Sequence, residues 1–77
     1  MKKIIVYSTQ VCPYCIMLKN FLKQNNIQFD EVNLSENKKA KEELFQKTGQ
    51  MVVPITKIDE ELVVGYNLKK IKELLKL

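Results

Sequence analysis

The residues best suited to chemistry in this sequence are two cysteines, Cys12 and Cys15, separated by Pro13 and Tyr14. Side chains three positions apart on a helix share one face, so the two sulfur atoms would lie within reach of a disulfide. The sequence contains no histidine, which excludes a Cys–His catalytic pair. The chemistry open to the pair is thiol–disulfide exchange, in which one thiolate attacks a disulfide and the second thiol resolves the product.

A Cys-x-x-Cys pair has other uses, and most of them need more than this chain supplies. A structural disulfide between Cys12 and Cys15 would close a very short loop and stabilise the fold little. A tetrahedral zinc site needs four ligands, and one chain offers two thiols and no histidine. Two chains could still pool four thiolates, so a thiolate-bridged dimer that binds zinc or an iron–sulfur cluster stays open as the alternative function.

The segments around the cysteines predict a strand–helix–strand unit. Residues 4–7 form an uninterrupted β-branched and aromatic run, typical of a strand buried on both faces. Pro13 suits the first turn of a helix that ends at Asn25-Asn26. Residues 27–33 alternate apolar and polar side chains, as a second strand does. The apolar side of the helix is predicted to contain Ile16, Met17, Leu18, Phe21 and Leu22.

The rest of the chain predicts a helix, a β-hairpin and a last helix. The second helix is capped by Ser35 or Asn37, runs to Lys47 and stops at Thr48-Gly49. Residues 52–58 and 62–64 flank a turn at 59–61, and Asn67 caps the last helix. The buried stripes of the two helices are predicted to be Ala40, Leu44 and Phe45, and Leu68, Ile71, Leu74 and Leu75. The order βαβαββα predicts the α/β class, with a four-stranded mixed sheet and three helices in one domain over residues 1–77.

The position of the cysteines in this order assigns them different roles. Cys12 is expected at or just before the helix N-terminus, where unpaired N–H groups and the helix dipole favour a thiolate. Cys15 lies deeper in the helix, so we expect it to be more buried and to act second. Further activation is expected from nearby amides, with Lys19 as an additional candidate.

Composition narrows the partners and the compartment. The 13 basic residues are all lysines, and a chain without arginine lacks the side chain that nucleic-acid readers favour, so no nucleic-acid partner is expected. No apolar run approaches the roughly 18 residues of a spanning helix, and the run at 4–7 is too short for a signal peptide. We therefore expect a cytoplasmic protein with no membrane contact, a monomer, whose paired cysteines are not a structural staple.

The dipeptide Val53-Pro54 is the second informative feature. Proline is tolerated at the start of a strand, where it removes only one ladder donor. A trans bond that simply begins an edge strand is the commoner case. A cis bond would leave neighbouring backbone groups free to pair with an extended peptide, as in strand addition.

The order of these motifs resembles that of the glutaredoxins over essentially the whole chain. The matching segments are 4–8, Cys12-Pro-Tyr-Cys15, Thr48-Gly49, Val53-Pro54 and Val64-Gly65. The resemblance implies a thioredoxin fold in which Val53-Pro54 is a cis-proline site that faces the cysteines. It also implies that Tyr14, Val52 and Val53 line a groove for glutathione or an extended substrate segment. It implies redox chemistry on disulfide-containing proteins, with no tightly bound cofactor and with glutathione as a co-substrate.

The sequence departs from the glutaredoxin pattern at the positions that would hold glutathione. Thr9 replaces a lysine that binds a glutathione carboxylate, and Val52 replaces the threonine of a Thr-Val-Pro motif. Val64-Gly65-Tyr66-Asn67 stands where a Gly-Gly pair and a following acidic residue hold the γ-glutamyl end. These changes are similar to those in short glutaredoxin-like redoxins that serve ribonucleotide reductase and are reduced by thioredoxin reductase. The implied electron source is therefore glutathione or thioredoxin reductase, with weaker glutathione binding expected.

Overall fold

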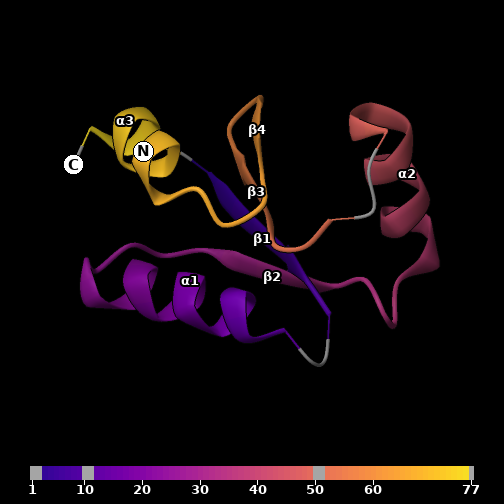
Figure 1. Ribbon diagram of the computed structural model, residues 1–77, viewed down its shortest axis with the longest axis horizontal. Coiled ribbons are helices and arrows are strands. Elements are labelled where there is room, and N and C mark those ends of the chain that lie inside the picture. Colours follow the sequence, from indigo (N-terminus) through magenta and orange to yellow (C-terminus); the bar gives the residue numbers. More distant parts are fainter. Residues whose placement is uncertain (1–2, 10–11, 50–51, 77) are drawn as a thin grey trace.

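The computed structural model describes residues 3–9, 12–49 and 52–76, so Met1 and Lys2 at the start of the N-terminal run lie outside it. The elements follow the predicted order (Figure 1). The strands are β1 (Ile4–Ser8), β2 (Asp30–Asn33), β3 (Ile55–Ile58) and β4 (Glu61–Val64). The helices are α1 (Pro13–Gln24), α2 (Lys38–Thr48) and α3 (Leu68–Leu75).

The four strands form one mixed sheet in the order β2-β1-β3-β4. β1 pairs with β2 in parallel, from Ile5 opposite Asp30 to Ser8 opposite Asn33. β1 pairs with β3 in the antiparallel direction, and β3 pairs with β4 in the same way. The α/β class and the mixed sheet are therefore as predicted.

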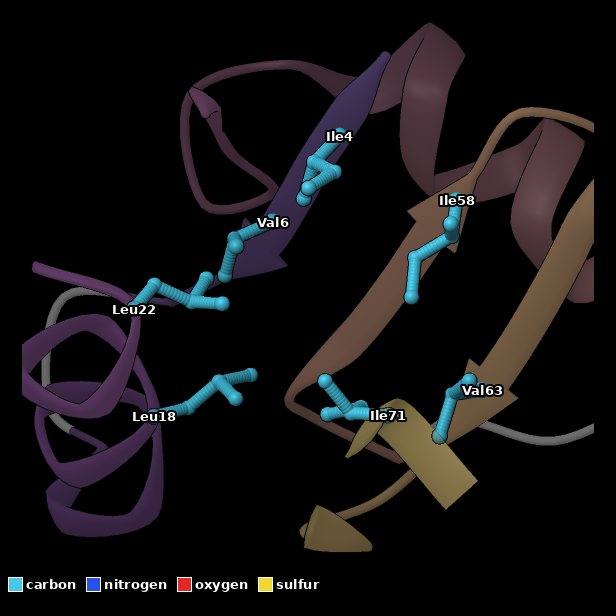
Figure 2. Packing of buried hydrophobic residues seen from close by; sticks show 7 residues of the cluster. All are labelled: Ile4, Val6, Leu18, Leu22, Ile58, Val63 and Ile71. Carbon is cyan, nitrogen blue, oxygen red and sulfur yellow. The ribbon is translucent and has the colours of Figure 1, made fainter. Parts of the chain in front are cut away.

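The main core lies on one face of the sheet, beneath α1 and α3. Leu18 and Leu22 from α1 meet Ile71 from α3 and four strand residues, and Figure 2 shows these side chains pointing toward one another. The strand residues are Ile4, Val6, Ile58 and Val63. Alternate strand positions turn to the opposite face, where α2 packs through Leu44 against Leu34 and Ile55. Figure 1 shows α2 apart from the other two helices.

Two predicted strands are shorter than expected, for reasons visible in the backbone. The strand expected at 27–33 begins at Asp30, because the Ile27 N–H is used by the cap that ends α1. Asn26 has a left-handed backbone with φ 58°, and the Ile27 N–H donates to the Leu22 carbonyl at 2.9 Å, which is a Schellman cap. The strand expected at 52–58 begins at Ile55, because Tyr7 opposite Ile55 is the last β1 residue to pair with β3.

The structure also differs from the sequence-based predictions at the hairpin turn, at the cap of α2 and in the buried stripes of α1 and α2. The turn is only Asp59-Glu60, with Ile58 opposite Glu61, and Asp59 takes the left-handed backbone that a glycine would otherwise supply. Asn37 rather than Ser35 caps α2, accepting a hydrogen bond from the Ala40 N–H at 3.0 Å. The three apolar side chains Ile16, Met17 and Phe45 are exposed instead of buried. The residues of β1 at positions 5 and 7 are half-buried, so this strand is fully covered on one face only.

Candidate functional site

The sheet topology gathers the predicted site residues at one edge. Ile55 at the start of β3 pairs with both Tyr7 near the end of β1 and Val64 at the end of β4. Ser8 also pairs with Asn33 at the end of β2. The segments that continue from these strand ends therefore lie at the same edge, which places residues 9, 12, 52–54 and 65–67 together.

Cys12 stands at the N-terminus of α1. Its backbone is extended, and Pro13 occupies the first helical position, where a missing N–H breaks no hydrogen bond. Its sulfur accepts a hydrogen bond from the Cys15 N–H at 3.2 Å, so a cysteine sulfur takes the place of the usual serine or aspartate oxygen at the cap. The expected position of Cys12 is confirmed.

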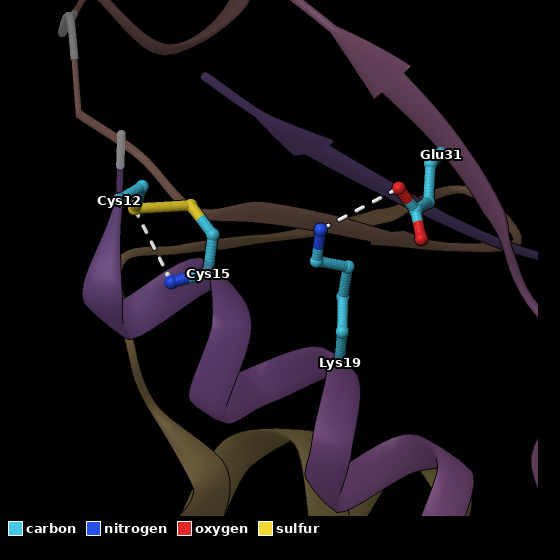
Figure 3. Close-up of a disulfide and its surroundings, with 4 residues drawn as sticks. All are labelled: Cys12, Cys15, Lys19 and Glu31. Carbon is cyan, nitrogen blue, oxygen red and sulfur yellow. Dashed lines mark hydrogen bonds and ion pairs between the residues drawn. A yellow bond between two sulfur atoms is a disulfide. The ribbon is translucent and has the colours of Figure 1, made fainter. Parts of the chain in front are cut away.

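The two cysteines form a disulfide, with their Cα atoms 5.2 Å apart (Figure 3). Both are buried, but unequally: Cys12 is 7% exposed and Cys15 is 1% exposed. Cys15 lies one turn into the helix, as expected, and solvent reaches the pair through Cys12.

The charged side chains near the start of α1 determine the electrostatic surroundings of Cys12. The first turn of α1 carries no acidic side chain that would repel an anion. The Lys19 ammonium, an additional candidate from the sequence, instead faces the Glu31 carboxylate of β2 at 3.5 Å (Figure 3). This ion pair directs the lysine charge toward β2, whereas the N-terminus of α1 meets the Cys12 sulfur through the Cys15 N–H.

The loops beside β3 and β4 form a second part of the site. The Val53-Pro54 peptide bond is cis, as the resemblance implied. The Pro54 carbonyl accepts a hydrogen bond from the Gly65 N–H at 2.8 Å, which ties the two loops together. Gly65 has φ 82°, a backbone that favours glycine, and a Cβ there would lie 4.0 Å from Val52.

Three further predicted residues lie on the α3 side of this edge. Tyr14 and Tyr66 pack ring against ring, with their centroids 5.5 Å apart and their planes tilted by 32°. The Asn67 side chain accepts a hydrogen bond from the Lys70 N–H at 3.2 Å and so caps α3. Asn67 therefore has a structural task besides the predicted contact with substrate.

The remaining predicted residues line a cavity of about 160 Å³ on the α2 side. Thr9, Val52 and Val53 meet here, so the cavity adjoins the cis-proline loop. The other lining residues, which the sequence did not predict at this site, are Leu34, Ser35, Lys41, Leu44, Phe45 and Ile55. Among these lining residues Lys41 supplies the only charged side chain, and its position one turn before buried Leu44 is the signal that could have placed it there.

The described residues hold no group of three or more His, Cys, Asp or Glu side chains placed to bind a metal ion. In the part of the chain described here, no helix has the length and apolar character needed to cross a membrane.

The chain is similar in sequence and in structure to known proteins. A family model described as Glutaredoxin matches residues 4–63. A protein described as an uncharacterized glutaredoxin-like 8.6 kDa protein in the rubredoxin operon of Clostridium pasteurianum is 39% identical over 70 residues, covering 91% of this chain and 93% of that protein. The glutaredoxin of Pseudomonas aeruginosa is 34% identical over 65 residues, covering 84% of this chain and 77% of that protein.

Solved structures show the same likeness. The crystal structure of a glutaredoxin from Archaeoglobus fulgidus matches with a TM-score of 0.85 at 29% identity, covering 100% of this chain and 89% of that one. The predicted thioredoxin fold is confirmed by this match.

Proposed function

This chain belongs to the glutaredoxin family, and we propose that it is a thiol–disulfide oxidoreductase in which Cys12 attacks and Cys15 resolves. The observation that carries the proposal is the placement of Cys12 as the N-cap of α1, with the Cys15 N–H aimed at its sulfur. A sulfur in this position is better stabilised as an anion than a sulfur inside the helix.

The proposed reaction transfers two electrons from the two cysteines to one substrate disulfide and needs no other reactant. The Cys12 thiolate forms a bond to one substrate sulfur, and the other substrate sulfur leaves as a thiolate. Cys15 then loses its proton to solvent and attacks the Cys12 sulfur, which releases the second substrate thiolate. The substrate gains two electrons, and the enzyme is left with the Cys12–Cys15 disulfide seen in the structure.

We propose protein disulfides and glutathione mixed disulfides as substrates, with glutathione or thioredoxin reductase restoring the dithiol. The cis-proline loop supports an extended peptide substrate. Val52 and Val53 lie before Ile55, where the pairing of β3 with β1 begins, so their backbone groups are outside that ladder and can pair with a peptide. The Lys41 ammonium in the adjoining cavity supports a substrate with a carboxylate, although Thr9 supplies no charge.

A pair of single substitutions tests the division of labour. In a single turnover with pre-reduced protein and 2-hydroxyethyl disulfide, Cys12→Ser is expected to remove the reaction. Cys15→Ser is expected to react once and remain as a mixed disulfide, detected by mass spectrometry.

Selective alkylation gives an independent measurement on the wild-type chain. Brief iodoacetamide treatment of reduced protein near neutral pH should modify Cys12 before Cys15. Equal labelling of both thiols, or a mixed disulfide on Cys15 in the Cys12→Ser variant, would contradict the assignment.

A further inference from the structure

One side of α1 continues from the site as an exposed strip beside α3. Tyr14, Met17 and Phe21 are three and four residues apart, so they share one side of the helix. Two contacts show that this side faces α3 and the loop before it. Tyr14 packs on Tyr66, and the Lys72 ammonium of α3 lies 5.7 Å from the centre of the Phe21 ring.

The strip carries apolar side chains that the fold leaves uncovered. Tyr14 is 57% exposed and Met17 is 48% exposed, next to the helix end that carries Cys12. The flexible, polarisable side chain of methionine adapts to varied partner surfaces. An apolar surface that begins at a reactive thiol is well placed to be covered when a large substrate docks.

The strip is also flanked by positive charge. The charge comes from α3, which contains three lysines and one acidic residue, Glu73, whereas Lys19 of α1 faces Glu31 of β2. Because Lys72 contacts Phe21, helical spacing places Lys69 on the same α1-facing side of α3. The acidic side chains of the sheet lie elsewhere, at the hairpin turn and in β2.

We propose that Tyr14, Met17, Lys69 and Lys72 form the docking surface for a protein substrate that presents an acidic segment with an apolar side chain next to its disulfide. This inference rests on the proposed function and specifies its partner. A segment lying along the strip would bring its disulfide to Cys12, with its apolar side chain against Met17 and its carboxylates beside the lysines. Only a protein supplies both the disulfide and the apolar side chain, and the absence of arginine disfavours a nucleic acid.

Two synthetic peptides with the same intramolecular disulfide test the proposal. One carries aspartates and a leucine beside the disulfide, and the other carries asparagines in place of the aspartates. In single turnovers at low salt, we expect pre-reduced protein to react about tenfold faster with the acidic peptide, because electrostatic complementarity acts mainly on association. The preference should shrink at high salt.

Matched lysine variants locate the effect. Lys69→Gln combined with Lys72→Gln should remove most of the preference. As a control, Lys38→Gln combined with Lys39→Gln removes the same amount of charge from exposed lysines of α2, on the other side of the sheet. This variant should keep the preference for the acidic peptide. The single variant Lys69→Gln leaves Lys72 in contact with Phe21, so it can be measured even if the double variant folds poorly. We expect Lys69→Gln to reduce the rate preference for the acidic peptide about threefold, which is part of the roughly tenfold effect of both lysines.

The proposed contact between Met17 and the apolar side chain of the substrate is tested separately. The Met17→Gln variant is compared with the wild-type chain on the leucine peptide and on a peptide in which serine replaces the leucine. The substitution should slow the leucine peptide several-fold and affect the serine peptide little. Equal slowing of both peptides would remove Met17 from the docking surface and overturn the proposal.

The rate with 2-hydroxyethyl disulfide, an uncharged small substrate, serves as the reference for each variant. If the wild-type chain fails on this substrate, the proposed function itself is wrong. If it reduces the small disulfide but shows no peptide preference, or if the α2 variant loses the preference equally, the docking surface is wrong. Lysine-dependent binding to phosphatidylglycerol vesicles without a peptide preference would assign the strip to a membrane surface and also overturn the proposal.

Discussion

The two faces of the sheet are packed very differently. On the α1 and α3 face, seven buried side chains form one cluster, and Leu18, Leu22 and Ile71 are fully buried. On the α2 face, the buried cluster among the described residues is formed by Leu34, Leu44 and Ile55, and a cavity opens beside them. The closely packed face fixes the helix that carries the reactive sulfur, while the open face leaves a recess next to the cis-proline loop.

This difference indicates how a chain of 77 residues combines stability with binding. A small domain buries too little surface to fill both faces and still keep a recess for substrate. We therefore expect the residues under α1 and α3 to contribute most of the free energy of unfolding, and those around the recess to contribute less. Four measurements can test this separation.

The largest expected effect is the loss of a core leucine on the closely packed face. Leu18→Ala should lower the free energy of unfolding by about 3–4 kcal/mol, since it creates a cavity among fully buried side chains. Leu44→Ala, beside an existing recess, should cost about 2 kcal/mol. Urea unfolding followed by circular dichroism measures both. Equal losses would show that the two faces contribute alike.

A charge added to the open face should change binding rather than stability. Thr9→Lys places a second cation beside Lys41 in the cavity and should lower KM for a glutathione mixed disulfide about tenfold, or about 1.4 kcal/mol, with kcat little changed. Lys41→Gln should shift KM in the opposite direction. Unchanged kinetics in both variants would show that the cavity holds no substrate carboxylate.

A smaller effect is expected from Thr56 on the closely packed face. Its hydroxyl is fully buried and has no hydrogen-bond partner within the described residues. Thr56→Val keeps the shape and removes an unsatisfied polar group, so the free energy of unfolding should rise by about 1 kcal/mol. Thr56→Ser, which keeps the hydroxyl and loses a methyl group, should instead destabilise the protein. A stabilising Ser variant would contradict this account.

The smallest effect concerns alkaline pH on the open face. Partial burial, with Glu43 nearby, raises the pKa of Tyr7 above its usual value of 10.0. The unfolded chain therefore ionises this phenol first, so stability is retained below about pH 10 and falls as the pH rises through the folded-state pKa. Tyr7→Phe should flatten this fall in urea unfolding measured between pH 9 and 11. A slope identical to that of the wild-type chain would exclude Tyr7 as its source.

Local sequence signals predicted much of the fold and the chemistry. Pro13 and Asn67 mark helix starts because capping and the missing proline N–H act within a few residues. Gly49 ends α2 in a left-handed backbone for the same local reason. The position of Cys12 followed directly from these signals.

The errors arose where tertiary contacts decide. Ile16 and Met17 match a helical stripe in type, but only the arrangement of the sheet and α3 determines which side of α1 is covered. Ile27 looks like a strand residue, yet its N–H is used by the cap of α1. Lys41 joins Thr9 at the recess only because α2 packs across the sheet from residues far away in sequence.

The pairing of β1 with β3 has a consequence for how the protein is made. Lys3 and Asp59, 56 positions apart, exchange hydrogen bonds at the end of this ladder, and α3 adds Ile71 to the core later still. Long-range pairing of this kind cannot form on the ribosome until most of the chain has emerged. Cys12 and Cys15 precede Asp59 and Ile71 in the chain, so the nascent chain carries both thiols before the ladder and the core that fix α1 are complete.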